Sequence, residues 1–187
     1  MCIRDRVAWK TPRKSDATKK FSFTTAQAIE VNGKTQIISP GSNVVYSLDP
    51  EDGGVLWQVR YDGYSVIPRP ILHRGLLYIC TGYNTPSLYA IRPTGSGDVT
   101  DTHVEWVVKQ AAPHTPSLLL HEDELYMVSD RGIASCLDAE TGKTIWKERI
   151  EGAYSASPLL AGDRIYFQNE EGKATICLLY TSDAADE

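Results

Sequence analysis

Short apolar runs alternate with tight polar turns along the whole chain, and this spacing is typical of β-strands. The clearest copies are 70–78 and 158–166, in which two apolar runs flank a turn that contains Gly. Residues 28–36 and 117–126 are looser copies. Apolar runs joined by Asn-Gly or Gly-Asp predict pairs of strands in hairpins. No stretch sustains a 3.6-residue period, so we expect almost no helix.

Four tryptophans divide the chain into units of similar length. Trp9, Trp57, Trp106 and Trp146 are separated by 48, 49 and 40 residues. A period of about 40–50 residues suits one four-stranded blade of a β-propeller. In the third unit, strands are expected at about 117–120, 124–128, 133–137 and 144–148. The predicted fold class is all-β: a β-propeller fragment of about three and a half four-stranded antiparallel blades in an open arc.

Two of these units share a turn in which Gly follows Asp by four residues and Trp follows Gly by four. The turn residues are Asp49 and Gly53 before Trp57, and Asp138 and Gly142 before Trp146. The Asp side chain can accept hydrogen bonds from turn amides, and the Gly can take the positive φ of a bulged hairpin. The Trp ring can then fill the space between neighbouring blades. The unit before Trp106 has a longer polar connection instead.

The two ends share no pattern with the repeat. Residues 1–6 and 177–187 both read as translations of a transposase adapter, whose two strands are reverse complements. Such segments are excluded from fold reasoning. We therefore expect a propeller fragment at 7–176, with blades at about 10–57, 58–106 and 107–146 and a partial blade at 147–176.

Composition narrows the classes of partner. The chain has 187 residues, of which 42% are hydrophobic, and a net charge of -5, which is typical of globular proteins with an apolar core. The charges are mixed in sign, so no basic stripe indicates nucleic-acid binding. No apolar run approaches the roughly 20 residues of a transmembrane helix. The partners that remain are a protein or a small polar ligand.

The segments 136–146 and 155–166 resemble the pyrroloquinoline-quinone (PQQ) type repeat, and the resemblance extends over 7–176. That superfamily contains quinoprotein alcohol dehydrogenases, an outer-membrane assembly lipoprotein and many exported bacterial propellers of unknown role. The resemblance implies a β-propeller and a periplasmic or otherwise exported location. It does not by itself imply a cofactor, because the last two classes bind no quinone.

An aromatic or His residue beside a hydroxyl recurs where the first strand of each unit is expected. The four copies are 21–23, Tyr64-Ser65, His114-Thr115 and Tyr154-Ser155. In a propeller these segments lie near the central axis, where they either pack the blade entry or line a binding site. The candidate ligand-binding residues are Tyr64, Arg69, His114 and Tyr154. Arg69 and His114 suit an anionic or sugar-like ligand.

The resemblance also leaves an alternative, a part of a PQQ- and Ca²⁺-dependent quinoprotein dehydrogenase. That activity needs Ca²⁺ held by carboxylate and amide oxygens, an Asp base and a Trp beneath the quinone. The chain has no adjacent Cys pair, and its tryptophans all belong to the repeat. No Ser-His-Asp or Cys-His arrangement stands out. The sequence thus favours a non-catalytic scaffold or binding module with no catalytic residue, cofactor or metal.

Two other groups of residues have a simpler interpretation. Asp98, Asp101 and His103 could hold a divalent metal, but their spacing fits no defined site, and a solvated turn is favoured. Cys80 and Cys136 lie in apolar strand sequence and are interpreted as buried core thiols. A propeller buries its blade faces only when neighbouring blades cover them, so we expect this fragment to associate or to be marginally folded.

Overall fold

The computed structural model describes residues 6–83 and 85–179, and these residues form four small β-sheets. The strands of the first sheet are β1 (Gln27–Val31), β2 (Lys34–Gly41), β3 (Val44–Leu48), β4 (Val55–Arg60) and β8 (Gly97–Asp98). Those of the second are β5 (Ile71–His73), β6 (Leu76–Cys80), β7 (Leu88–Ile91) and β9 (Val104–Val108). Those of the third are β10 (Leu119–His121), β11 (Glu124–Val128), β12 (Ile133–Asp138) and β13 (Thr144–Arg149). The fourth has β14 (Leu159–Ala161), β15 (Arg164–Gln168) and β16 (Ala174–Leu178).

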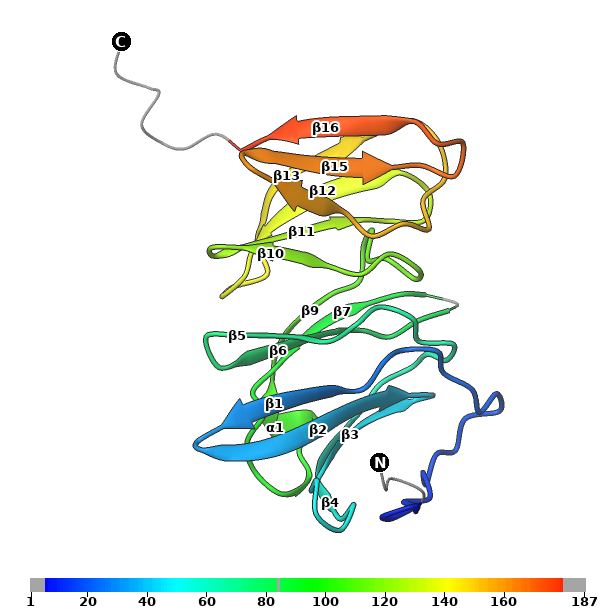
Figure 1. The fold of residues 1–187 in the computed structure, drawn as a ribbon, viewed down its shortest axis with the longest axis vertical. Helices are drawn as coiled ribbons and strands as arrows, with labels where there is room; N and C mark the ends of the chain where they lie inside the picture. The colour runs from blue at the N-terminus through cyan, green and yellow to red at the C-terminus, as the bar shows by residue number, and fades with distance from the viewer. Residues whose placement is uncertain (1–5, 84, 180–187) are drawn as a thin grey trace, which may run out of the picture.

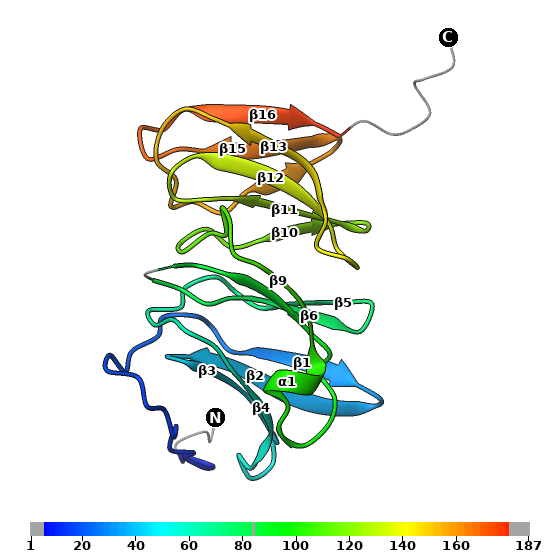
Figure 2. The same cartoon turned by 180° about the vertical axis from the view of Figure 1, so that it is seen from behind.

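The sheets follow one another in chain order along the long axis of the molecule (Figure 1). Seen from behind, the first and fourth sheets again lie at opposite ends, so the arc is open (Figure 2). Within each sheet the strands run antiparallel in sequence order, apart from the parallel pair of β4 and β8. The single helix of the described residues is α1 (Thr100–His103). The prediction of an all-β propeller fragment in an open arc with almost no helix is confirmed.

The ends of the chain add two details. β16 includes Cys177 and Leu178, which lie in the segment expected to derive from an adapter. Residues 1–5 and 180–187 lie outside the described residues, so the expected limits 1–6 and 177–187 stay predictions. Residues 7–20 form no strand, but they lie along the first sheet, where the Lys14 backbone N–H donates to the Tyr46 hydroxyl over 3.0 Å.

Each inter-sheet space holds one layer of the core, because side chains alternate between the two faces of a strand. In β6, Leu77 and Ile79 pack against the first sheet, whereas Tyr78 and Cys80 pack against the third. The strands of the third sheet divide in the same way between the second and fourth sheets. Apolar burial contributes about 25 cal/mol per Å², so adjacent sheets stabilise one another rather than folding independently.

The fourth strand of each of the first three sheets carries its Trp at the same register. Trp57, Trp106 and Trp146 lie opposite Ser47, Ala90 and Cys136, and a β-bulge follows directly in each sheet. Because the Trp has the same register in each sheet, residues at the same distance from the Trp occupy equivalent positions in different blades.

Two tryptophans pack onto the glycine turn of the following sheet. Trp9 Nε1 donates to the Pro50 carbonyl over 3.0 Å, and Trp106 Nε1 donates to the Glu140 carbonyl over 2.8 Å. A Cβ atom on Gly53 would lie 2.4 Å from Trp9, and one on Gly142 would lie 2.6 Å from Trp106. The glycine is thus required for the close approach of the ring as well as for its positive φ.

Trp57 meets a different environment, because the connection in the second sheet is long. Its Nε1 donates to Gln36 Oε1 over 2.9 Å, and Ser47 Oγ donates to the same oxygen over 2.7 Å. The buried amide of Gln36 thus replaces the turn carbonyl that the other two tryptophans contact. Trp57 is completely buried by this arrangement.

The long connection folds back to the first sheet. Residues 97–98 form β8, which pairs in parallel with the edge of β4, and α1 follows. The sequence favoured a solvated turn here. Residues 95–98 are exposed, as expected of a solvated turn, whereas Val99 is buried in the core. The backbone is ordered by the free hydrogen-bonding groups at the edge of β4, a partner that local sequence does not reveal.

Candidate functional site

Four rings form a row at the side of the arc where the first strands begin. Phe21 and Tyr64 have ring centroids 5.7 Å apart, Tyr64 and Tyr83 5.4 Å, and Tyr83 and His114 5.5 Å. We call Phe21, Tyr64, Tyr83 and His114 the aromatic row. Tyr83 is 51% exposed, so the row presents an apolar surface with polar tips to solvent.

His114 is held at one end of the aromatic row by its backbone and its ring. Its backbone N–H donates to Asp130 Oδ2 over 2.7 Å, and its Nε2 lies 3.2 Å from the Ser65 carbonyl oxygen. Because a carbonyl only accepts, Nε2 carries the proton and Nδ1 faces Asp130 at 3.8 Å. Ser65 has a φ of 55°, which is uncommon for a residue other than Gly. The ring is therefore fixed by two elements rather than by one loop.

A cleft of about 580 Å³ lies beside His114, between the second and third sheets. Its lining residues are Tyr83, Pro86, Ala111, Ala112, His114, Ser129, Asp130, Arg131, Ile133, Lys147 and Arg149. Three of these side chains are cationic, whereas the single carboxylate, Asp130, already accepts hydrogen bonds from the backbone N–H groups of His114 and Thr115. The net charge of the lining favours an anionic ligand.

The cations of this cleft are available for binding. Arg131, Lys147 and Arg149 are exposed, and none of the three forms an ion pair with another described residue. Arg149 Nη1 donates to the Arg131 carbonyl over 3.2 Å, which directs the Arg149 side chain along the cleft. Lys147 and Arg149 are two residues apart on β13, so both side chains project from the same face of the strand.

The structure brings together two of the four residues expected to bind a ligand. Tyr64 and His114 both belong to the aromatic row, with Tyr83 between them. Arg69 lies elsewhere, in a groove of about 340 Å³ between β1 and β5, and its backbone N–H donates to Ser117 Oγ over 3.0 Å. Tyr154 is 1% exposed, and its hydroxyl donates to the Glu151 carbonyl over 2.9 Å.

Sequence reasoning missed Tyr83, Arg131, Lys147 and Arg149. Tyr83 follows β6 rather than preceding a first strand, so the repeat pattern did not mark it. Lys147 lies in the strand predicted at about 144–148 and Arg149 directly follows it, and this alternation was the one available signal, since it places two cations on one face. Arg131 lies in the turn between β11 and β12, whose approach to the second sheet depends on blade packing.

Both repeat cysteines are buried, as the sequence predicted. Burial, with a minor contribution from nearby carboxylates, raises the pKa of the Cys136 thiol to about 12. Burial likewise raises the pKa of the Cys80 thiol. Thiols in this state are poor nucleophiles and poor metal ligands. Among the described residues, no cluster of His, Cys, Asp and Glu is placed to hold a metal ion.

The lining of the cleft beside His114 does not fit Ca²⁺. The cleft is rimmed by cations, and its carboxylate, Asp130, is occupied by backbone N–H groups. Trp9 and Trp106 are packed on turn glycines, and Trp57 is buried against Gln36. Each of these three rings is thus engaged in packing, which is the structural role that the repeat predicts for it.

Comparison with known proteins identifies relatives along nearly the whole chain. A family model described as outer membrane protein assembly factor BamB matches residues 4–120 and 104–186. The outer membrane protein assembly factor BamB of Alkalilimnicola ehrlichii is 24% identical over 153 residues, which are 76% of this chain and 37% of that protein. The chain therefore spans less than half the length of this curated relative.

Solved structures show the same fold. BamB from Moraxella catarrhalis superposes with a TM-score of 0.60 and 14% identity over 81% of this chain and 47% of that one. The computationally designed Ika4 protein gives a TM-score of 0.60 with 9% identity over 94% and 99%. Quinohemoprotein alcohol dehydrogenase ADHIIG from Pseudomonas putida HK5 gives 0.54 with 23% identity over 79% and 23%.

These structural likenesses concern the fold, whereas the family model concerns the sequence itself and extends over the first three blades and most of the fourth. No helix among the described residues is long and apolar enough to cross a membrane. This chain belongs to the family of outer membrane protein assembly factor BamB, within the superfamily of PQQ-like β-propellers.

Proposed function

We propose that this chain is part of a non-catalytic propeller scaffold that binds protein partners during outer-membrane protein assembly. The family and the relative from Alkalilimnicola ehrlichii support this role, since both are described as assembly factors. The proposal includes an exported, periplasmic location in a bacterium and no requirement for a cofactor or nucleic acid. The proposed role, location and lack of a cofactor apply to the whole protein of which these four blades are a part.

The observation that carries the proposal is the cleft beside the aromatic row. Exposed Tyr83 and the cations Arg131, Lys147 and Arg149 gather within one concave surface between two rigid sheets. Tyr and Arg are enriched at the energetic centres of protein interfaces because they combine apolar area with hydrogen bonding. The two repeat thiols are buried with raised pKa values and lie outside the lining of this cleft.

A binding experiment tests the role. The immobilised chain is exposed to detergent-solubilised outer membranes of Alkalilimnicola ehrlichii, and retained components of the outer-membrane assembly machinery are quantified by mass spectrometry. We expect the wild-type chain to retain them and an Arg131→Glu, Lys147→Glu variant to retain far less, because reversed charge repels an acidic partner. Lys109→Glu, a change on the exposed end of the second sheet, is the control and should retain them normally.

Two results would contradict the proposal. One is equal retention by the charge-reversed variant and the wild type. The other is tight, Ca²⁺-dependent binding of PQQ to the chain in calorimetry, which would support the quinoprotein alternative instead.

A further inference from the structure

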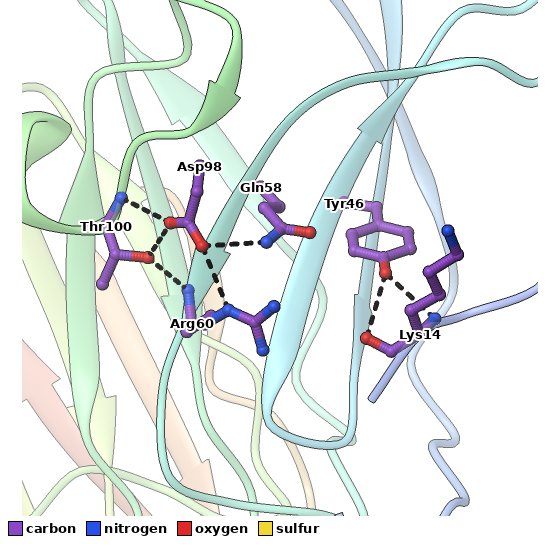
Figure 3. A network of polar contacts seen from close by, with 6 residues as sticks. All are labelled: Lys14, Tyr46, Gln58, Arg60, Asp98 and Thr100. Carbon is purple, nitrogen blue, oxygen red and sulfur yellow. Dashed lines mark hydrogen bonds and ion pairs between the residues drawn. The ribbon is translucent and has the colours of Figure 1, made fainter. Parts of the chain in front are cut away.

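The edge of the first sheet shows how a blade of this protein binds an added strand. β8 pairs in parallel with β4, with Trp57 opposite Gly97 and Gln58 opposite Asp98. Asp98 Oδ2 accepts hydrogen bonds from Gln58 Nε2 at 2.9 Å and from Arg60 Nε at 3.0 Å (Figure 3). An aspartate is thus held between two donors that are two residues apart on the edge strand.

The backbone of the same edge is satisfied by the added segment. The Val99 N–H donates to the Gln58 carbonyl over 3.0 Å, and the Arg60 N–H donates to Thr100 Oγ1 over 2.9 Å. The Thr100 hydroxyl in turn donates to Asp98 Oδ1 over 2.6 Å (Figure 3). The sequence Gly-Asp-Val-Thr at 97–100 therefore forms hydrogen bonds with the backbone of the β4 edge, and its Asp carboxylate pairs with the cationic side chain of Arg60.

The register of the sheets identifies the equivalent positions in the third sheet. Trp57 and Trp146 lie opposite Ser47 and Cys136, directly before the β-bulge in each sheet. Gln58 and Arg60 therefore correspond to Lys147 and Arg149. Both donors are kept, and the third sheet adds a second positive charge.

The edge of β13 is uncovered among the described residues. β13 pairs with β12 on one side and with no described strand on the other, and five of its six residues are exposed. The second sheet offers no such pair of donors, because Val107 and Lys109 lie at the corresponding positions. Of the three sheets that carry a Trp on their fourth strand, the third alone combines two donors with an edge that no described strand pairs with.

We propose that the free edge of β13 binds an extended segment of a partner protein, in parallel, with an Asp side chain between Lys147 and Arg149. Backbone hydrogen bonds to a sheet edge provide affinity, and side-chain contacts provide specificity. Lys147 and Arg149 also line the cleft beside His114, so a residue two positions from the bound Asp would face the same cleft as Tyr83. The inference rests on the proposed scaffold function and names the chemistry of its partner.

A peptide with the sequence of residues 95–102, acetylated and amidated, is the probe. The edge of β4 already holds this sequence within the chain at high effective concentration, so added peptide is directed to other edges. In ¹⁵N-labelled chain we expect amide shifts to concentrate at 144–149. The peptide with Asp98→Asn should bind about tenfold more weakly, because a charge-assisted hydrogen bond becomes a neutral one.

Charge reversal in the protein completes the test. The Lys147→Glu, Arg149→Glu variant should lose the shifts at 144–149, whereas Lys109→Glu should keep them, and unchanged circular dichroism verifies folding. Shifts that map to β4, β9 or β16, or binding that survives the double reversal, would overturn the proposal. If the peptide fails while the wild-type chain still retains assembly components, the edge-binding inference is wrong and the scaffold function stands.

Discussion

At the scale of single residues, a turn glycine can serve in two ways: it adopts a positive φ, and it leaves space for a Trp ring. Substitution can separate these two effects. Gly142 has a φ of +69°, and a Cβ atom there would lie 2.6 Å from Trp106. Gly162 has a φ of +61°, but nothing lies within 4 Å of its Cβ position. Both positions require a backbone with positive φ, but only Gly142 also makes room for the Trp106 ring.

Replacing these glycines by Ala should therefore have unequal effects. Gly162→Ala should cost about 1 kcal/mol through the left-handed backbone. Gly142→Ala should cost about 1–3 kcal/mol more, because the Trp106 ring must move. Urea unfolding followed by Trp fluorescence measures both free energies. Equal losses would show that the ring contact does not limit this turn.

Cys80 and Cys136 should be unreactive in the folded chain. Burial raises both pKa values, that of Cys136 to about 12, so little thiolate exists at pH 8. We expect a disulfide reagent to modify them no faster than the chain unfolds, and in urea to modify them at once. Rapid labelling of either thiol in the native chain, located by peptide mass spectrometry, would contradict their buried position.

At the scale of elements, β8 joins the second unit to the first by an interaction that depends on charge. Hydrogen bonds from Thr100, and then from Gln58, lower the pKa of Asp98 below its usual value near 4. A depressed folded-state pKa stabilises the chain above the unfolded pKa, and this contribution is lost as the pH falls through the folded value. The side chain is 44% exposed, so the contribution is screened by solvent.

Asp98→Asn should reduce stability at pH 7 by about 1 kcal/mol or less, because the ion pair with Arg60 is exposed. The difference between variant and wild type should narrow as the pH is lowered below about 4. Urea unfolding of both proteins at pH 7 and at pH 3 measures this difference in free energy of unfolding. The contributions of other titrating groups cancel, because the variant and the wild type share them. A gap that widens in acid would exclude the carboxylate as its cause.

At the scale of the whole molecule, the third and fourth sheets leave apolar surface uncovered. Ile145, Leu159, Ile176 and Leu178 are 53%, 62%, 51% and 46% exposed. A groove of about 360 Å³ between the third and fourth sheets is lined by Trp146, Phe167 and Ile176. Exposed apolar patches of this kind promote association.

The chain should therefore associate in a concentration-dependent way. Sedimentation velocity between 1 and 100 µM should show increasing mass, and Ile176→Lys should shift the distribution toward monomer because a charge resists burial. Val107→Lys, on the edge of the second sheet, is the matched control. A monomer with a sharp melt that does not change with concentration would contradict this prediction.

The repeat made much of the fold predictable. Trp57, Trp106 and Trp146 marked the fourth strand of three sheets, and the spacing between Asp138 and Gly142 marked a turn. The aromatic and His residues at blade entries predicted two members of the aromatic row, Tyr64 and His114. These predictions succeeded because they depend on contacts within one repeat or between adjacent repeats.

The pattern of residues by itself determined the strands, the turns and the order of the sheets, because alternation and glycine placement act over a few residues. The tertiary structure alone decided that β8 pairs with β4, that Tyr83 joins His114, and that Arg69 lies away from them. Each of these contacts depends on how neighbouring blades pack, and that packing is set by many weak side-chain contacts acting together. The cleft and the free edge of β13 arise from that packing, and the alternation of Lys147 and Arg149 is the one local signal of either in the chain.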